Sequence, residues 1–210
     1  VVAAFALYIS SNVDTSVDDI VLVSNDTTSS TKIYHVDENG KLVGYDTELA
    51  EAVFENLGYE VTFKEINWDN KYTDLNSGVI DCVWNGMTLT DEVKAAMDCS
   101  KAYCNNAQIV VVPADKAADY QTEESVKDLT FAVEAGSAGK KAAEAKGFKF
   151  TEVQYQSDTL MEVAGGTSDA AIIDSLMAGA MVGEGTGYDK LTYTVPLTTE
   201  EYGVGFRKGS

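Results

Sequence analysis

Apolar positions recur along the chain with two periods, one typical of helices and one typical of strands. Apolar residues from Leu49 to Leu57 follow the helical period, so we predict a helix that is capped at Asp46 or Thr47 and ends at Gly58. Further helices are predicted at Lys71–Asn76, after Gly139 through Lys146, at Ser157–Ala164 and at Ser175–Val182. Strands are predicted at Ile20–Ser24, Glu60–Ile66, Gln108–Val112, Phe131–Val133, Phe150–Tyr155, Ala170–Ile173, Leu191–Val195 and Tyr202–Phe206, and Asn39-Gly40 is typical of a hairpin turn.

The stretch Val79–Ser100 combines these patterns at a candidate ligand site. Its first residues are apolar except for Asp81, which predicts a buried strand. A polar turn, Asn85–Thr88, follows, and Thr90 is placed to cap a helix whose first turn is acidic. A strand that leads into a helix through a glycine-containing loop presents backbone N–H groups where open α/β sheets bind small ligands. The pattern alone leaves open a strand–helix junction without a ligand.

Strands alternate with helices in both halves of the chain. This order predicts an α/β protein with two lobes, each a mostly parallel sheet flanked by helices. We assign residues 1–19 to an N-terminal lead-in, residues 20–109 and 203–210 to lobe 1, and residues 110–202 to lobe 2.

Composition and charge narrow the class of protein. A hydrophobic content of 45% in 210 residues is sufficient for a globular core. The net charge of −19, from 34 acidic and 15 basic residues, repels phosphate groups, so we expect no nucleic-acid partner. The longest apolar run, Val1–Ile9, is shorter than the ~20 residues of a membrane-spanning helix.

Catalytic and metal-binding patterns are weak in this sequence. The three cysteines fit no zinc-binding spacing, and we expect neither a metal nor a cofactor. A Cys82–Cys104 or Cys99–Cys104 disulfide is left open. The single histidine, His35, lies far in sequence from the other candidate site residues, so we do not expect an enzyme.

Four segments resemble one protein family. Asn39–Ala50 resembles the G-x-x-x-G-[FY]-D-x-[DE]-L-A segment of the family-3 extracellular solute-binding proteins, and Asp81–Glu92 resembles their D-x-x-x-x-G-M-T-[IL]-T-x-E block. Asp169–Asp174 is similar to their D-A-x-x-x-D strand, and Tyr202–Gly209 to their returning hinge strand. These segments occur in the family's order and together cover about residues 20–210.

The resemblance implies a two-lobed clamshell of the type II periplasmic-binding-protein fold that closes on a ligand. It implies a monomeric extracytoplasmic receptor, in the periplasm or at the cell surface, that delivers a polar amino acid to ABC transporter permease subunits. A lipid anchor would lie in a segment before Val1. The family normally continues beyond the hinge strand with helices that pack on lobe 1, so we expect these C-terminal helices to be missing after Ser210.

In lobe 1, the resemblance assigns ligand contacts to five residues. Trp68 would cover the ligand side chain, and Asn85, Gly86 and Thr88 would form hydrogen bonds with the ligand. Asp26 occupies a position where the family often has a ligand-facing polar residue. Without the resemblance, Trp68 is equally well interpreted as a core residue and Asp26 as a solvated loop residue.

In lobe 2, the resemblance assigns an α-carboxylate site and an α-ammonium site. Gly136, Ser137 and Ala138 would offer backbone N–H and hydroxyl donors to the carboxylate at a helix N-terminus. Asp174 would accept the ammonium group. As alternatives, Ser137 is only a helix cap, and Asp174 is the N-cap of the following helix.

One feature departs from the family pattern. The family's helix carries an arginine that holds the ligand carboxylate with a bidentate pair, whereas this chain has Val93 there. In one account, helix N-termini at Thr90 and Ser137, assisted by Lys71 or Lys94, hold the carboxylate. In the other account, the ligand is a cationic amine that lacks an α-carboxylate and binds the acidic candidates Glu134 and Asp174.

Two other classes of function share this fold. An amino-acid dehydratase-like enzyme would need a positioned acid or base. A sensor domain of a membrane receptor would use the same binding chemistry, and only segments outside the sequence would distinguish it.

Overall fold

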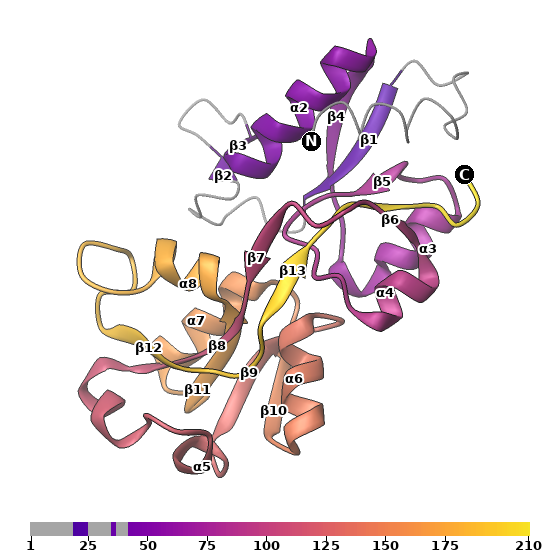
Figure 1. The fold of residues 1–210 in the computed structure, drawn as a ribbon. Coiled ribbons are helices and arrows are strands. Elements are labelled where there is room, and N and C mark those ends of the chain that lie inside the picture. Colours follow the sequence, from indigo (N-terminus) through magenta and orange to yellow (C-terminus); the bar gives the residue numbers. More distant parts are fainter. Residues whose placement is uncertain (1–18, 25–34, 37–41) are drawn as a thin grey trace. The chain divides into compact units, whose positions relative to one another are not determined.

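The structure, a computed structural model, describes residues 19–24, 35–36 and 42–210, and these pack as two compact units (Figure 1). The first unit contains the described residues up to Cys104 together with Tyr202–Ser210, and the second contains Asn105–Glu201. The chain therefore passes from one unit to the other at residues 104–105 and returns at residues 201–202. The lead-in before Asp19, the expected turn at Asn39-Gly40 and Asp26 lie outside the described residues.

In the first unit, strands from distant parts of the chain form both parallel and antiparallel pairs. Strand β1 (Asp19–Ser24) pairs in parallel with β4 (Glu60–Glu65). Strand β14 (Gly205–Phe206), from the returning end of the chain, lies between β5 (Cys82–Val83) and β6 (Asp98–Cys99) and is antiparallel to both. The remaining elements of this unit are β2 (His35–Val36), β3 (Leu42–Val43), α2 (Tyr45–Leu57), η1 (Trp68–Asn70), α3 (Lys71–Asn76) and α4 (Asp91–Ala96).

Helix α2 ends as the sequence predicts but begins differently. Gly58 adopts a left-handed conformation at its C-terminus, with φ of 85°. The prediction that Asp46 or Thr47 caps the helix is wrong, because Gly44 holds the N-cap position and both residues lie buried in the first turn. The carboxylate of Asp46 accepts a hydrogen bond from Gly86 instead of from its own helix.

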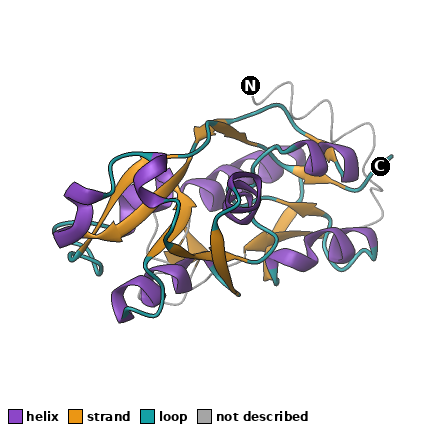
Figure 2. Ribbon diagram, turned by 90° about the horizontal axis from the view of Figure 1, so that it is seen from below, coloured by secondary structure: helices purple, strands orange, loops and turns teal. Residues whose placement is uncertain are grey.

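The second unit is built on one five-stranded sheet with the strand order β10-β9-β11-β8-β12. Neighbouring strands β10, β9 and β11 are parallel, whereas β8 runs antiparallel to both of its neighbours, so the sheet is mixed. Its strands are β8 (Gln108–Pro113), β9 (Thr130–Glu134), β10 (Lys149–Val153), β11 (Ala170–Asp174) and β12 (Leu191–Pro196). Its helices are η2 (Ala114–Asp119), α5 (Glu123–Val126), α6 (Ala138–Lys146), α7 (Gln156–Gly165) and α8 (Ser175–Met181), and helices flank the strands (Figure 2).

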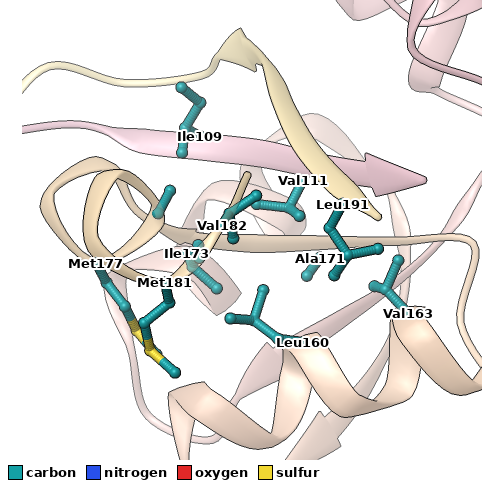
Figure 3. Close-up of a cluster of buried hydrophobic side chains, with 11 residues drawn as sticks. Ile109, Val111, Leu160, Val163, Ala171, Ile173, Met177, Met181, Val182 and Leu191 are labelled. Carbon is teal, nitrogen blue, oxygen red and sulfur yellow. The ribbon is translucent and has the colours of Figure 1, made fainter. Parts of the chain in front are cut away.

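Strand β8 shows why a continuous apolar run is required in the middle of this sheet. Ile109 and Val111 face a cluster with side chains of α7 and α8, as Figure 3 shows. Val110 and Val112 face the opposite cluster, which contains Ala143 of α6. Because successive strand residues point to opposite faces and both faces are covered, β8 needs apolar side chains at each position from Ile109 to Val112.

Two short strands connect the units and pair with each other. They are β7 (Cys104–Asn106) and β13 (Glu200–Tyr202). The predicted strand Tyr202–Phe206 is thus divided between β13 and β14. Cys82, Cys99 and Cys104 are not joined in disulfides, so neither of the two pairings left open by the sequence forms.

Gly139 sets how closely α6 approaches the sheet. A Cβ atom at this position would lie 2.9 Å from the carbonyl oxygen of Ile172 and 3.0 Å from Oε1 of Gln108. Gly139→Ala should therefore lower the free energy of unfolding by about 1–3 kcal/mol, because the backbone carbonyl cannot move away.

Gly179 of α8 is the matched control, because a Cβ there would meet nothing within 4 Å. Gly179→Ala should raise the free energy of unfolding by up to about 1 kcal/mol. Urea denaturation of both variants checks this, and equal effects at the two positions would contradict the close approach at Gly139.

Candidate ligand-binding site

In the first unit, a buried carboxylate holds the turn that the sequence assigns to the ligand. The Gly86 N–H donates to Oδ2 of Asp46 at 2.7 Å, and the Tyr103 hydroxyl donates to the same oxygen at 2.9 Å. Asp46 comes from the first turn of α2, so the helix fixes a turn 40 residues away. The Gly86 N–H is therefore engaged within the protein, and its carbonyl is the backbone group that it can offer to a ligand.

Burial dominates the electrostatics of Asp46. Its side chain is removed from water, which raises the pKa of the carboxyl from 3.8 to about 6. The hydrogen bonds from Gly86 and Tyr103 lower the pKa again but only in part, because they favour the charged form.

The backbone conformation favours glycine at position 86. Its φ of 52° belongs to the left-handed region that other residues rarely adopt. The Tyr202 ring lies beside it, since a Cβ atom there would make an ordinary contact with this ring at 3.4 Å. This ring belongs to a series of aromatic contacts in which the Tyr103 ring lies 6.3 Å from Tyr202 and 6.1 Å from Trp84, centroid to centroid.

Trp68 lies in the core of the first unit, where it is 6% exposed and packs with Ile66 and Leu75. The ammonium group of Lys71 lies 5.0 Å from its ring centroid and 4.7 Å from that of Tyr72, and it donates to the Trp68 carbonyl at 3.1 Å. Because Lys71 is only 3% exposed, this cation is part of the packing around Trp68.

Val93 stands at the position of the family's carboxylate-binding arginine, and it is also a core residue. Val93 is 3% exposed and lies in the same apolar cluster as Met87 and Met97. Thr90 caps α4 as predicted, since its Oγ1 accepts the Val93 N–H at 3.2 Å. The single arginine, Arg207, donates through Nε to the Leu75 carbonyl at 2.9 Å, which gives it a structural contact in the first unit.

In the second unit, the start of α6 presents backbone donors. Ser137 is the N-cap, and its Oγ accepts the Lys140 N–H at 3.1 Å, as the capping interpretation predicts. Gly136 precedes it with φ of 69°. Among the described residues, no acceptor contacts the N–H groups of Ala138 and Gly139, which belong to the first turn of the helix.

Asp174 lies at the carboxyl end of β11 and precedes α8. It occupies the N-cap position, but its side chain forms no capping hydrogen bond. Its Oδ1 accepts from Nδ2 of Asn106 at 2.6 Å and from Nε2 of Gln108 at 2.7 Å, and its Oδ2 accepts from Nε2 of Gln156 at 2.9 Å. Three neutral amides thus orient this carboxylate, which the cap interpretation does not explain.

The sequence prediction missed these amides. Asn106, Gln108 and Gln156 are polar residues next to or at the start of apolar elements, and that position is the signal that could have identified them. Gln108 is the most informative of them, because the Cβ geometry at Gly139 places its Oε1 against the first turn of α6. The Gln108 amide therefore lies between the Asp174 carboxylate and Gly139 in the first turn of α6.

The fold defines the class of protein. The structure of holo ArgBP from T. maritima matches this one with a TM-score of 0.82 at 29% sequence identity, over 92% of this chain and 84% of that chain. Mixed sheets with flanking helices and this match identify a type II periplasmic-binding-protein fold.

The chain belongs to the bacterial extracellular solute-binding proteins, family 3, whose family model matches residues 21–210. The arginine-binding extracellular protein ArtP of Bacillus subtilis (strain 168) is 31% identical over 156 residues, which are 72% of this chain and 60% of ArtP. The L-cystine-binding protein TcyA of the same organism is 30% identical over 192 residues, 91% of this chain and 70% of TcyA. The family expectation from the four sequence segments is confirmed, and the match spans less than two thirds of ArtP.

The buried carboxyl of Asp46 makes the stability of the first unit depend on pH. Because its pKa is raised from 3.8 to about 6 in the folded state, its stabilising contribution is present below pH 3.8 and is lost as pH rises through 6. Asp46→Asn removes this dependence. Between pH 7 and pH 4, the wild type should gain roughly 2–3 kcal/mol of unfolding free energy relative to the variant.

Urea denaturation of both proteins across this pH range measures the difference. The same change in both proteins would mean that Asp46 titrates as an ordinary exposed carboxyl.

Proposed function

We propose that this chain is the ligand-binding part of an extracytoplasmic receptor that captures a polar amino acid and delivers it to an ABC importer. The observation that carries the proposal is the Asp174 carboxylate, which three neutral amides hold at the end of a strand near the N-terminus of α6. A negative charge and backbone N–H donors in one unit are complementary to the ammonium and carboxylate groups of an amino acid. The relatives named for binding arginine and L-cystine support the same ligand class.

In the second unit, Asp174 accepts the α-ammonium group. The α-carboxylate binds the N–H groups at the start of α6, with Gly136, Ser137 and Ala138 forming this site. Ser137 can contribute its hydroxyl hydrogen while its oxygen accepts from Lys140, because a hydroxyl both donates and accepts.

In the first unit, Asn85, the Gly86 carbonyl and Thr88 bind polar groups of the ligand, and Trp68 covers its side chain or stem. Asp26 contributes a further polar contact. Closure of the two lobes on the ligand follows from the family resemblance, because a ligand stabilises the conformation for which it has the higher affinity.

The carboxylate is held without an arginine. Val93 is a core residue and Arg207 is bound to a backbone carbonyl, so the N-terminus of α6 remains the favoured carboxylate site. Lys71 is held against Trp68, and Lys94 lies exposed on α4. We therefore favour an α-amino acid over an amine that lacks a carboxylate.

The remaining features of the receptor follow from the family. We propose that it acts without catalysis, as a monomer, outside the cytoplasm in the periplasm or at the cell surface, and that ABC permease subunits are its partners. No helix in the described part of the chain is both long and apolar enough to cross a membrane.

Ligand class is tested by titration calorimetry at pH 7.5 against the standard amino acids, L-cystine, small amines and polyamines. An α-amino acid should bind, and the matching amine without its carboxylate should bind at least about tenfold more weakly, since a charge-assisted hydrogen bond contributes ~1.5–3 kcal/mol. Binding of amines but not of α-amino acids would contradict the proposed carboxylate site.

Asp174→Asn should weaken binding of the amino acid identified in this way by roughly a hundredfold or more, because it removes the charge that faces the ammonium. Asp189→Asn is the control, since Asp189 is exposed in the same unit. Circular dichroism verifies that both variants fold. Full affinity in Asp174→Asn would show that Asp174 only organises its amide neighbours.

A further inference from the structure

A second carboxylate shares the amide neighbours of Asp174. Nδ2 of Asn106 donates at 2.6 Å to Oδ1 of Asp174 and at 2.7 Å to Oε1 of Glu200. Nε2 of Gln108 donates at 2.7 Å to each of the same two oxygens. Each amide nitrogen carries two hydrogens, so each of them can serve both carboxylates. Oδ1 of Asp174 and Oε1 of Glu200 are therefore joined through the two amide nitrogens in a closed ring of four hydrogen bonds.

The amides of this ring are fixed by other contacts. The Ser175 hydroxyl donates to Oδ1 of Asn106 at 3.0 Å, which sets the orientation of that amide. Gln156 binds Asp174 twice, since its Nε2 donates to Oδ2 at 2.9 Å and its Oε1 accepts the Asp174 N–H at 2.7 Å. Asn106 and Gln108 are 5% and 2% exposed. The distance between the carboxylates is thus determined by buried neighbours.

In the described part of the chain, the side chains that donate to the Asp174 carboxylate are neutral amides. They are Asn106 from β7, Gln108 from β8 and Gln156 from α7, and Glu200 from β13 shares the first two. Desolvation and the negative charge of Glu200 raise the pKa of Asp174 from 3.8 to about 6, and the three amides oppose this rise. A second carboxylate on the same two amide nitrogens favours a protonated Asp174 or a cation beside it, because like charges repel each other.

We infer that Asp174, which shares two amide neighbours with the second carboxylate Glu200, holds a proton at mildly acidic pH and exchanges it for the ammonium group of the ligand. This inference rests on the proposed function, because it needs a ligand with an ammonium group. A carboxylate has about four acceptor positions, and Asp174 uses three of them for the amides, so one remains for an ammonium N–H. Glu200 thereby becomes a second determinant of ligand charge.

The exchange makes ligand affinity depend on pH in a defined direction. Above pH 6, Asp174 is deprotonated and the ammonium binds without competition. Below pH 6, the ligand must displace the proton, so the affinity falls by up to tenfold for each pH unit. Without the charge of Glu200, the pKa of Asp174 is lower, so the loss of affinity begins at a lower pH.

The test compares wild type with Glu200→Gln, because glutamine retains an acceptor oxygen for both amides while it removes the charge. Calorimetry with the amino acid that binds in the ligand panel should give an affinity about tenfold lower at pH 5 than at pH 8 for the wild type. For Glu200→Gln, the loss should be less than about threefold. Glu201→Gln, an exposed neighbour on β13, is the matched control and should behave as the wild type.

Two further measurements separate this inference from the proposed function. Calorimetry at pH 6 in buffers with different ionisation enthalpies should show proton release upon binding in the wild type. In the ligand-free protein, the ¹³C carboxyl resonance of Asp174, assigned with Asp174→Asn, should titrate near pH 6 and at a lower pH in Glu200→Gln. Binding with the same pH dependence in both proteins would overturn the exchange and leave the receptor function standing, whereas a complete absence of amine binding would overturn the receptor function.

Discussion

The carboxylate of Asp174 is the group on which the second unit's site depends. It ends β11, and its amide neighbours belong to the crossing strand β7, the central strand β8 and the start of α7. A part-buried carboxylate among neutral amides is costly to leave without compensation, because the amides stabilise its charge only in part. The negative charge of Asp174 is therefore compensated only in part by the surrounding elements, and a cationic group can compensate the rest. This is why we propose the end of β11 as a binding site rather than a simple strand–helix junction.

The first unit also contains a buried carboxylate, but this one holds a loop in place. Asp46 is also a carboxylate removed from water, and its acceptor Oδ2 is occupied by a backbone N–H and a phenol. Here the donors belong to the turn at Gly86 and to the aromatic cluster, so the carboxylate holds the loop in place. Asp46 is a positioning residue, whereas Asp174 carries the charge that we assign to the ligand.

Much of the fold could be predicted from the sequence because it depends on local patterns. Helix α3, the cap at Thr90, the helix end at Gly58 and the strands of the second unit follow from periodicity and capping chemistry. The start of α2 could not be predicted, because Asp46 has a tertiary partner 40 residues away. The same reason explains why Gln108 and Glu200 were missed, since their role depends on side-chain hydrogen bonds between β8, β11 and β13. At Val93, the sequence indicated a missing arginine, and the structure adds that the side chain belongs to the core.

The central claim is that Asp174 receives an ammonium group. A crystal structure of the protein with its amino acid bound tests this claim directly, through the distance between the ligand's ammonium nitrogen and the Asp174 carboxylate. We predict a charge-assisted hydrogen bond of about 2.7–3.1 Å, with the amides of Asn106, Gln108 and Gln156 still in place. A bound amino acid whose ammonium lies on another acceptor, with Asp174 contacting only its amides, would contradict the account.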